Sequence, residues 1–150
     1  MPLVRFDLIK GRSPDQLAKL LDHAHRALVE SFRIPESDRY QVVTEHEPIH
    51  VVALDTGLGF QRTKDLVVVQ VVSRPRSMME KTAFYSSLAK ALEDKCGVSP
   101  SDLIISVVEN TDADWSFGKG EAQFLTGSLA GVKNEDAIEG PHFGARQHRG

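Results

Sequence analysis

The fold is decided by the stretch LVVVQVVSRPRS at residues 66–77, which repeats the pattern of PLVRFDLIKGRS at residues 2–13. The offset between the two copies is 64 residues, counted from Pro2 to Leu66. Each copy begins with an apolar run typical of a β-strand and ends at a serine. That serine is followed three residues later by a glutamine or a glutamate, a pattern that predicts a capped helix start. The two stretches therefore indicate two copies of one unit.

The match continues beyond the serines. Apolar residues at helical spacing follow in each copy, and a Ser-Asp pair then leads into a second apolar run, at residues 40–43 and 104–107. Residues 2–45 and 66–109 are therefore predicted to be two tandem β-α-β units, each with parallel strands. The helical residues are Leu17, Leu20, Leu21, Ala24 and Leu28 in the first unit, and Phe84, Tyr85, Leu88, Ala91 and Leu92 in the second.

Two such units predict an α/β (α+β) fold. In it, one four-stranded mixed sheet carries both helices on one face and is arranged about a pseudo-twofold axis. The strand at residues 66–72 is apolar on both sides, so the other sheet face needs a cover. The remaining segments or another copy of the chain could supply it, and oligomerisation is the more economical prediction.

The remaining segments complete the expected organisation. Residues 46–65 connect the two units, and the glycine turn at residues 56–59 lacks the lysine and the strand–helix setting of a phosphate loop. Residues 111–129 hold the only tryptophan and are predicted to form a short hairpin over a pocket. We expect a single domain over residues 1–129, followed by a polar tail over residues 130–150.

Composition excludes several classes of function. The chain of 150 residues has 41% hydrophobic residues and a net charge of −3, and its scattered Lys and Arg residues argue against a nucleic-acid surface. No apolar run is long enough to cross a bilayer, and charges within the first residues argue against a signal peptide. A single cysteine, Cys96, is interpreted as a small core residue and fits a reducing compartment. We therefore expect a cytoplasmic protein without membrane or nucleic-acid partners.

No metal site is expected either. His23 and His25 are two residues apart on a predicted helix, so their side chains diverge instead of converging on one ion.

Pro2 is the residue most suggestive of chemistry. It directly follows Met1, and a small second residue normally permits removal of the initiator methionine. The new terminus would be a secondary amine, which can act as a base, as a nucleophile or, when protonated, as a proton donor. A purely structural interpretation is also open, in which Pro2 opens a strand.

The repeat predicts what lies near Pro2. If the first strands of the two units pair antiparallel, Pro2 lies beside Arg74 and Arg76, and parallel pairing within the first unit brings Asp38 to the same end. Pro75 keeps the segment extended, and two guanidinium groups suit a bound carboxylate. The structural alternative is a pair of exposed arginines with Asp38 as their partner.

The equivalent position of the second unit has Leu66 with Lys10, Arg12 and Asp102. Residue 66 is internal and has no free amine, so one active site per chain is expected.

A free Pro2, a duplicated β-α-β unit and a carboxylate-binding arginine together resemble the tautomerase superfamily. More closely, the segments PLVRFDLIKGR, SDRYQVV, TKDLVVVQVVSRPRS, SPSDLIISVVEN and DADWSFGKGEAQFLTG resemble malonate semialdehyde decarboxylases. The resemblance covers about residues 2–129.

The resemblance implies a homotrimer that decarboxylates malonate semialdehyde to acetaldehyde and carbon dioxide without a cofactor. It implies catalytic roles for Pro2, Asp38, Arg74 and Arg76, the two arginines also binding the substrate. A hydrophobic wall beside the substrate is implied as well, formed by Trp115, Phe117, Phe124 and Leu129.

Two other functions stay open. The first is another Pro2-dependent enzyme, a tautomerase or a hydratase or dehalogenase of unsaturated acids. The charge on Pro2 separates these, because a neutral amine suits a tautomerase base and a charged one suits decarboxylation or hydration. The second is a non-catalytic trimeric binding module of the same fold.

Overall fold

A computed structural model describes residues 1–129 of the chain, in which Met1–Thr111 form one compact unit and residues 112–129 belong to a second. The sequence predicts one domain over residues 1–129, whereas the structure assigns residues 112–129 to the second unit. The polar tail expected at residues 130–150 lies outside the described residues. Each unit is described by itself.

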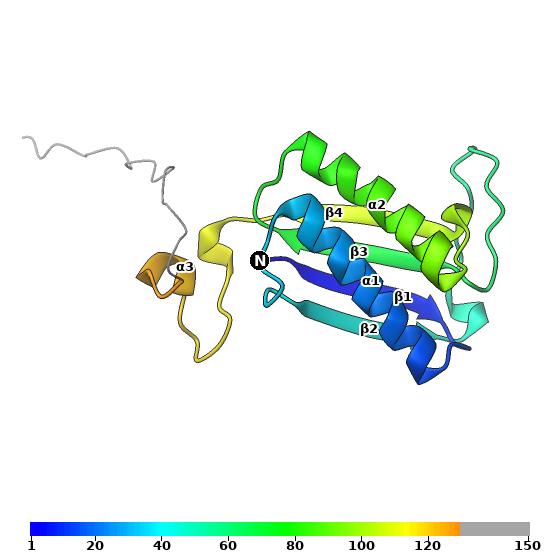
Figure 1. The fold of residues 1–150 in the computed structure, drawn as a ribbon. Helices are drawn as coiled ribbons and strands as arrows, with labels where there is room; N and C mark the ends of the chain where they lie inside the picture. The colour runs from blue at the N-terminus through cyan, green and yellow to red at the C-terminus, as the bar shows by residue number, and fades with distance from the viewer. Residues whose placement is uncertain (130–150) are drawn as a thin grey trace, which may run out of the picture. The chain divides into compact units, whose positions relative to one another are not determined.

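The first unit contains the two predicted β-α-β copies (Figure 1). The first copy has β1 (Leu3–Ile9), α1 (Pro14–Phe32) and β2 (Tyr40–His46). The second has β3 (Val67–Ser73), α2 (Met78–Cys96) and β4 (Leu103–Glu109). Short 3-10 turns at Pro48–His50 and Pro100–Asp102 precede β3 and β4.

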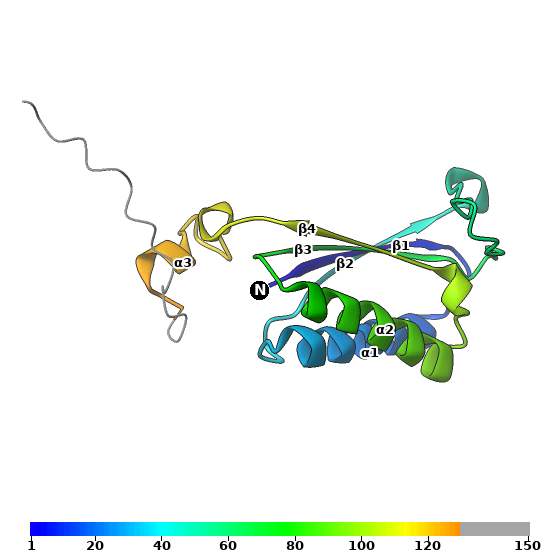
Figure 2. The ribbon, with the colours of Figure 1, turned by 90° about the horizontal axis from the view of Figure 1, so that it is seen from above.

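The strands form one four-stranded sheet in the order β2-β1-β3-β4. Pairing is parallel within each copy and antiparallel between β1 and β3, so the predicted mixed sheet is confirmed. Figure 2 shows α1 and α2 on the same side of this sheet. The two central strands run in opposite directions, so the start of one copy lies beside the end of the first strand of the other.

Both helices begin as their sequences predict. On α1, the Ser13 hydroxyl accepts a hydrogen bond from the Gln16 backbone N–H, and the Gln16 side chain accepts one from the Ser13 backbone N–H. Ser77 and Glu80 form the same two bonds on α2. Each pair satisfies backbone N–H groups that a helix start leaves unpaired. α2 ends at Cys96 and is capped by Gly97, whose φ of 66° is left-handed, a conformation that glycine adopts without strain.

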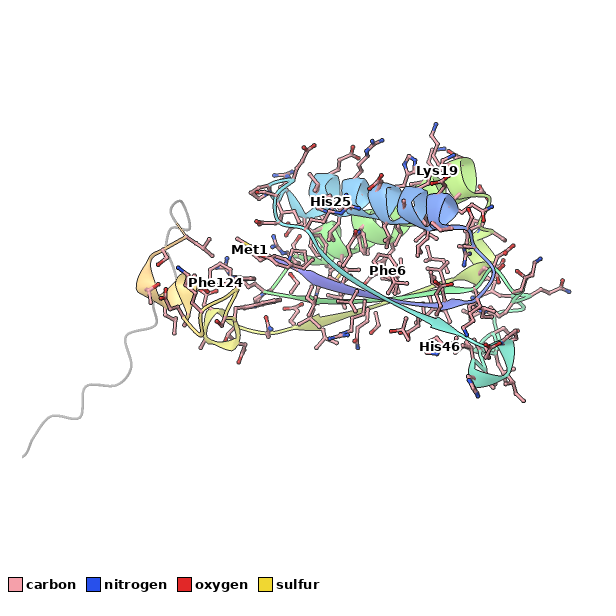
Figure 3. The ribbon with its side chains drawn as sticks, turned by 90° about the horizontal axis from the view of Figure 1, so that it is seen from below. Met1, Phe6, Lys19, His25, His46 and Phe124 are labelled. Atoms are coloured by element: carbon pink, nitrogen blue, oxygen red, sulfur yellow. The ribbon has the colours of Figure 1, made fainter. Side chains whose placement is uncertain are left out.

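The core lies between the helices and the sheet face that they cover. Phe6 projects from β1 into this layer (Figure 3) and is 1% exposed. Buried helix residues meet it from the other side, among them Leu20, Leu28, Leu88 and Leu92. Burial of this apolar surface is the main force that holds the repeat together.

The opposite sheet face carries apolar side chains that stay accessible. Tyr40 and Val42 on β2 are 39% and 40% exposed, and Val108 on β4 is 44% exposed. The connection after β2 also exposes Ile49 and Val52. These side chains bear out the need for a further cover on this face.

The prediction of a hairpin at residues 111–129 is wrong. Residues 112–129 form a 3-10 turn at Asp112–Asp114 and the one-turn helix α3 (Gln123–Thr126). The Gln123 side chain accepts from the Phe117 backbone N–H at 2.9 Å and donates to the Gly118 carbonyl at 2.9 Å. These bonds occupy backbone groups that a strand would need for pairing.

Candidate active site

Strand register places Pro2 at one end of the sheet, called the Pro2 end and defined by Pro2, Asp38, Arg74 and Arg76. Leu3 pairs with Val72 on β3 and with Tyr40 on β2. Pro2, one residue earlier, therefore lies between the last residue of β3 and the segment before β2, and it is buried. The structure thus brings to one end the four residues that the repeat predicted to meet there.

Arg76 is anchored at the C-terminal end of α1. Its Nη1 donates to the Phe32 carbonyl at 3.1 Å, and its guanidinium carbon lies 5.1 Å from the centre of the Phe32 ring. Its Nε donates to the Ser73 hydroxyl at 3.2 Å. Because contacts hold the guanidinium from several sides, little side-chain entropy remains to be lost when an anion binds.

The charges at this end act on one another. Burial lowers the pKa of Arg76, and the Glu80 carboxylate, 4.0 Å away, opposes that shift. The charge of Arg74 also lowers the pKa of Arg76, whereas that of Asp38 raises it. Arginine stays protonated in proteins, so two guanidinium groups share this region with the carboxyl groups of Asp38 and Glu80.

Ser73 shapes the segment that carries both arginines, a role that sequence reasoning missed. Its side chain is fully buried, and its hydroxyl donates to the Arg74 carbonyl at 2.8 Å while accepting from Arg76. The Asn110 backbone N–H donates to the Ser73 carbonyl at 2.8 Å. The repeat carries a signal for this role, because the strand end that has the apolar Ile9 in the first copy has the polar Ser73 in the second.

Asp38 is 8% exposed and sits in a turn before β2. Its backbone N–H donates to the Pro35 carbonyl at 3.0 Å, and His25 Nε2 hydrogen-bonds the Glu36 carbonyl at 2.8 Å. Among residues 1–129, no hydrogen bond or ion pair within 4.0 Å engages the Asp38 carboxylate. A nearly buried carboxylate without such a partner is stabilised when a cationic group lies beside it.

The equivalent residues at the other end, called the Leu66 end, are Leu66, Asp102, Lys10 and Arg12. Asp102 is 1% exposed and accepts from the Thr63 backbone N–H at 2.6 Å and from the Thr63 hydroxyl. Arg12 donates to the Asp65 carbonyl at 2.8 Å.

Lys10 forms an ion pair with Glu47 at 2.6 Å. The polar groups of the Leu66 end are thus engaged in contacts with the connection between the two copies.

The predicted wall residues lie in the second unit. Trp115 and Phe117 stack with ring centres 5.2 Å apart, and Phe117 meets Phe124 edge-on at 5.4 Å. Phe124 is buried at 6% exposure, and Leu129 is partly exposed. Three of the four residues therefore form one aromatic cluster within this unit.

Residues 1–129 contain no group of three His, Cys, Asp or Glu side chains able to hold a metal ion. None of the helices among them is long and apolar enough to cross a membrane.

Comparison with known proteins assigns the family. Two families, each described as tautomerase enzyme, match residues 38–118 and residues 2–61. A probable tautomerase of Bacillus subtilis, YrdN, is 58% identical over 129 residues, which cover 86% of this chain and 100% of that protein.

Two solved structures share both sequence and fold with this chain. The structure of a malonate semialdehyde decarboxylase is 53% identical, with a TM-score of 0.83, over 85% of this chain and 98% of that one. A second malonate semialdehyde decarboxylase, inhibited by 3-bromopropiolate, is 41% identical, with a TM-score of 0.81, over 85% and 98%. The chain therefore belongs to the tautomerase superfamily.

Proposed function

We propose that this protein decarboxylates malonate semialdehyde to acetaldehyde and carbon dioxide without a cofactor. The observation that carries the proposal is the arrangement of the Pro2 end, where Arg74 and Arg76 lie beside Pro2 and a nearly buried Asp38. The 53% identity to a malonate semialdehyde decarboxylase supports this substrate.

Removal of Met1 converts Pro2 into a secondary amine. The Asp38 carboxylate favours the protonated amine, whereas the two guanidinium groups oppose it. The protonated amine donates a hydrogen bond to the aldehyde oxygen of the substrate, or the neutral amine condenses with the aldehyde to an iminium ion with loss of water. Either route supplies the electrophile that decarboxylation needs.

Arg74 and Arg76 hold the substrate carboxylate by charge-assisted hydrogen bonds. They orient the C–C bond toward overlap with the carbonyl π system. When that bond breaks, the carboxylate leaves as carbon dioxide and the electron pair passes into the enol or enamine. A proton then adds at the carbon that lost the carboxylate, and the iminium route ends with hydrolysis that restores the amine and gives acetaldehyde.

The exposed sheet face supports a homotrimer, in which other copies of the chain cover Tyr40, Val42 and Val108. The aromatic cluster of the second unit would supply the hydrophobic wall, which favours departure of a neutral gas molecule. The proposed wall consists of the cluster residues Trp115, Phe117 and Phe124 together with Leu129.

A keto–enol tautomerase is the second candidate, supported by the relative named a probable tautomerase, at 58% identity. In that reaction a neutral Pro2 amine would remove and return a proton. The state of the amine separates the two functions.

The test compares turnover of malonate semialdehyde, an aryl pyruvate and a haloacrylate by purified protein whose intact mass lacks Met1. Decarboxylation should dominate, and Pro2→Ala should lower it about 10²- to 10⁴-fold, the range for a positioned proton donor. Light scattering should report three chains for both proteins. Leu66→Ala is the matched control at the other end, and it should lower stability but not turnover.

Preference for the aryl pyruvate would replace decarboxylase with tautomerase. Full activity in protein that retains Met1 would contradict any mechanism that uses the Pro2 amine, because an acylated proline nitrogen is neither basic nor nucleophilic.

A further inference from the structure

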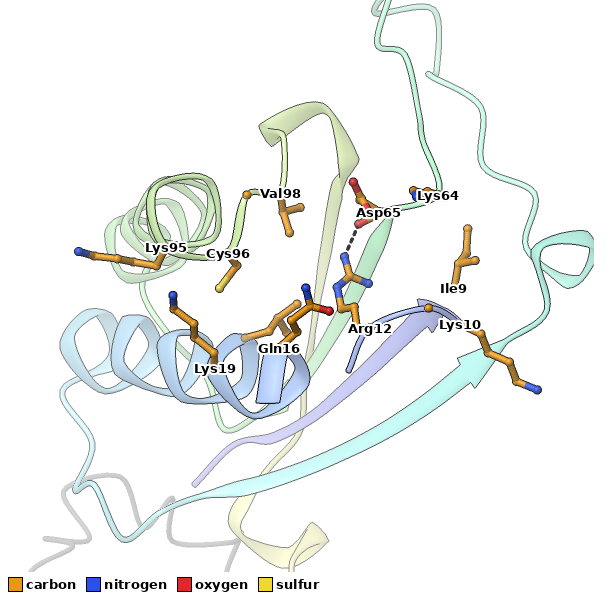
Figure 4. A pocket seen from close by; sticks show the side chains of 13 residues that line it. Ile9, Lys10, Arg12, Gln16, Lys19, Lys64, Asp65, Lys95, Cys96 and Val98 are labelled. Carbon is orange, nitrogen blue, oxygen red and sulfur yellow. Dashed lines mark hydrogen bonds between the residues drawn. The ribbon is translucent and has the colours of Figure 1, made fainter. Parts of the chain in front are cut away.

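A cavity of about 430 Å³ lies at the Leu66 end, far from the proposed active site along the sheet. Figure 4 shows it between the first turns of α1, the last turn of α2 and residues 64–65. Its volume falls within the range of cavities that bind small molecules. Nothing in the proposed decarboxylation uses this cavity.

The repeat explains why the cavity exists. Cys96, at its wall, corresponds to Phe32 in the first copy. The Phe32 ring is 1% exposed, packs against Phe84 with ring centres 5.5 Å apart and lies under Arg76. A cysteine is much smaller than a phenylalanine, so the space that the ring fills at the Pro2 end stays open at the Leu66 end.

The lining of this cavity is strongly basic. Arg12, which precedes α1, and Lys19 on α1 point into the space, whereas Lys10 and Lys95 extend outward at its rim (Figure 4). Lys64 adds a further positive charge. Asp65 contributes the one carboxylate among the lining residues.

The positive charges of Lys19 and Lys95 are specific to this end. The residues that correspond to Lys19 and Lys95 in the other copies are Ala83 and Ser31. Within residues 1–129, no carboxylate lies within 4.0 Å of the ammonium groups of Lys19, Lys64 or Lys95. Cations that surround a concave site and outnumber its carboxylates attract an anion.

We propose that this cavity is a second binding site, which takes one small organic anion per chain through a phosphate or carboxylate group. Lys19 and the N–H groups of Arg12 that do not bond the Asp65 carbonyl bind the anionic group, and Cys96, which is only partly buried, contacts the rest of the ligand. The site is non-catalytic, because the residue in the place of Pro2 is Leu66, which has no free amine. The inference does not depend on the proposed decarboxylase activity.

Calorimetric titration with inorganic phosphate and, separately, with succinate tests the site and identifies the preferred anionic group. We expect binding of at least one of them at millimolar concentration, one per chain, in wild type and in Arg74→Ala, which disables the other anion site. Lys19→Ala should weaken this binding about tenfold or more, since it removes a charge-assisted contact. Lys90→Ala is the matched control, because Lys90 pairs with Asp94 on an exposed helix face, and it should leave binding unchanged.

Cys96→Phe restores the aromatic residue of the other copy and should fill the cavity and abolish binding; if this variant fails to fold, Lys19→Ala alone decides. The proposal is overturned if neither anion binds wild type, if Lys19→Ala binds as tightly as wild type, or if Arg74→Ala removes all binding.

Discussion

The Pro2 end and the Leu66 end share one backbone design but use their side chains differently. Both have a strand end, a helix start, two basic residues and a buried aspartate. At the Leu66 end, Asp102 is bonded to Thr63 and Arg12 to the Asp65 carbonyl. At the Pro2 end, no such bond engages the Asp38 carboxylate among residues 1–129.

The difference teaches how a duplicated unit can keep its fold while only one copy carries the proposed chemistry. The connection at residues 46–65 follows the first copy and bonds Lys10, Arg12 and Asp102 at the Leu66 end. A polar group that is already bonded contributes to stability, whereas one without a partner is available to a ligand. The aspartate therefore stabilises the Leu66 end, whereas at the Pro2 end the Asp38 carboxylate has no such bond among residues 1–129.

The largest expected effect is a difference in kcat/KM between variants of the basic pair at the Pro2 end and variants of the basic pair at the Leu66 end. Arg74→Ala and Arg76→Ala should each lower kcat/KM by about ten- to a hundredfold, from loss of charge-assisted bonds worth roughly 1.5–3 kcal/mol. Lys10→Ala and Arg12→Ala should change kcat/KM little. Steady-state kinetics on malonate semialdehyde measures both pairs, and the reverse pattern would place the active site at the Leu66 end.

A smaller effect separates the two aspartates. Asp38→Asn removes the anion that favours the protonated Pro2 amine, so the pKa of that amine should fall and the pH–rate profile should move to lower pH. Asp102→Asn should instead lower the free energy of unfolding by about 1–3 kcal/mol, since it weakens a buried bond to Thr63.

pH–rate profiles and urea unfolding of both variants measure these outcomes. An unshifted profile in Asp38→Asn would show that Asp38 does not act on Pro2.

The smallest effect distinguishes the two helix starts. Hydrogen bonding to the Ser77 backbone N–H lowers the pKa of Glu80, and burial opposes that shift. A carboxylate with a lowered pKa in the folded state stabilises the protein above its unfolded pKa, and this contribution is lost as the pH falls.

Gln16, its counterpart on α1, has no charge to lose. Glu80→Gln should therefore cost about 0.3–1 kcal/mol at neutral pH and nothing in acid. Urea midpoints at both pH values test this, and an equal cost in acid would exclude the charge of Glu80 as the cause.

Local sequence was sufficient for much of the fold. The serine-based helix starts and the spacing of apolar residues gave both long helices, and the 64-residue repeat indicated the antiparallel pairing of β1 with β3. The prediction failed at residues 111–129, where glycines and aromatic residues suggested a hairpin. There the Gln123 side chain competes for backbone groups, and no periodic pattern reveals such a competition.

The sequence by itself determined the duplicated β-α-β unit, the end at which Pro2, Asp38, Arg74 and Arg76 meet, and the lack of a free amine at the other end. These follow from periodicity and from the direction of strand pairing, which short-range patterns encode. Only the tertiary structure decided which of the matching polar groups are already bonded, that Phe32 and Ser73 hold Arg76, and that Cys96 leaves a cavity. Those outcomes depend on which side chains meet across elements distant in sequence, and packing fixes them only once the whole unit has formed.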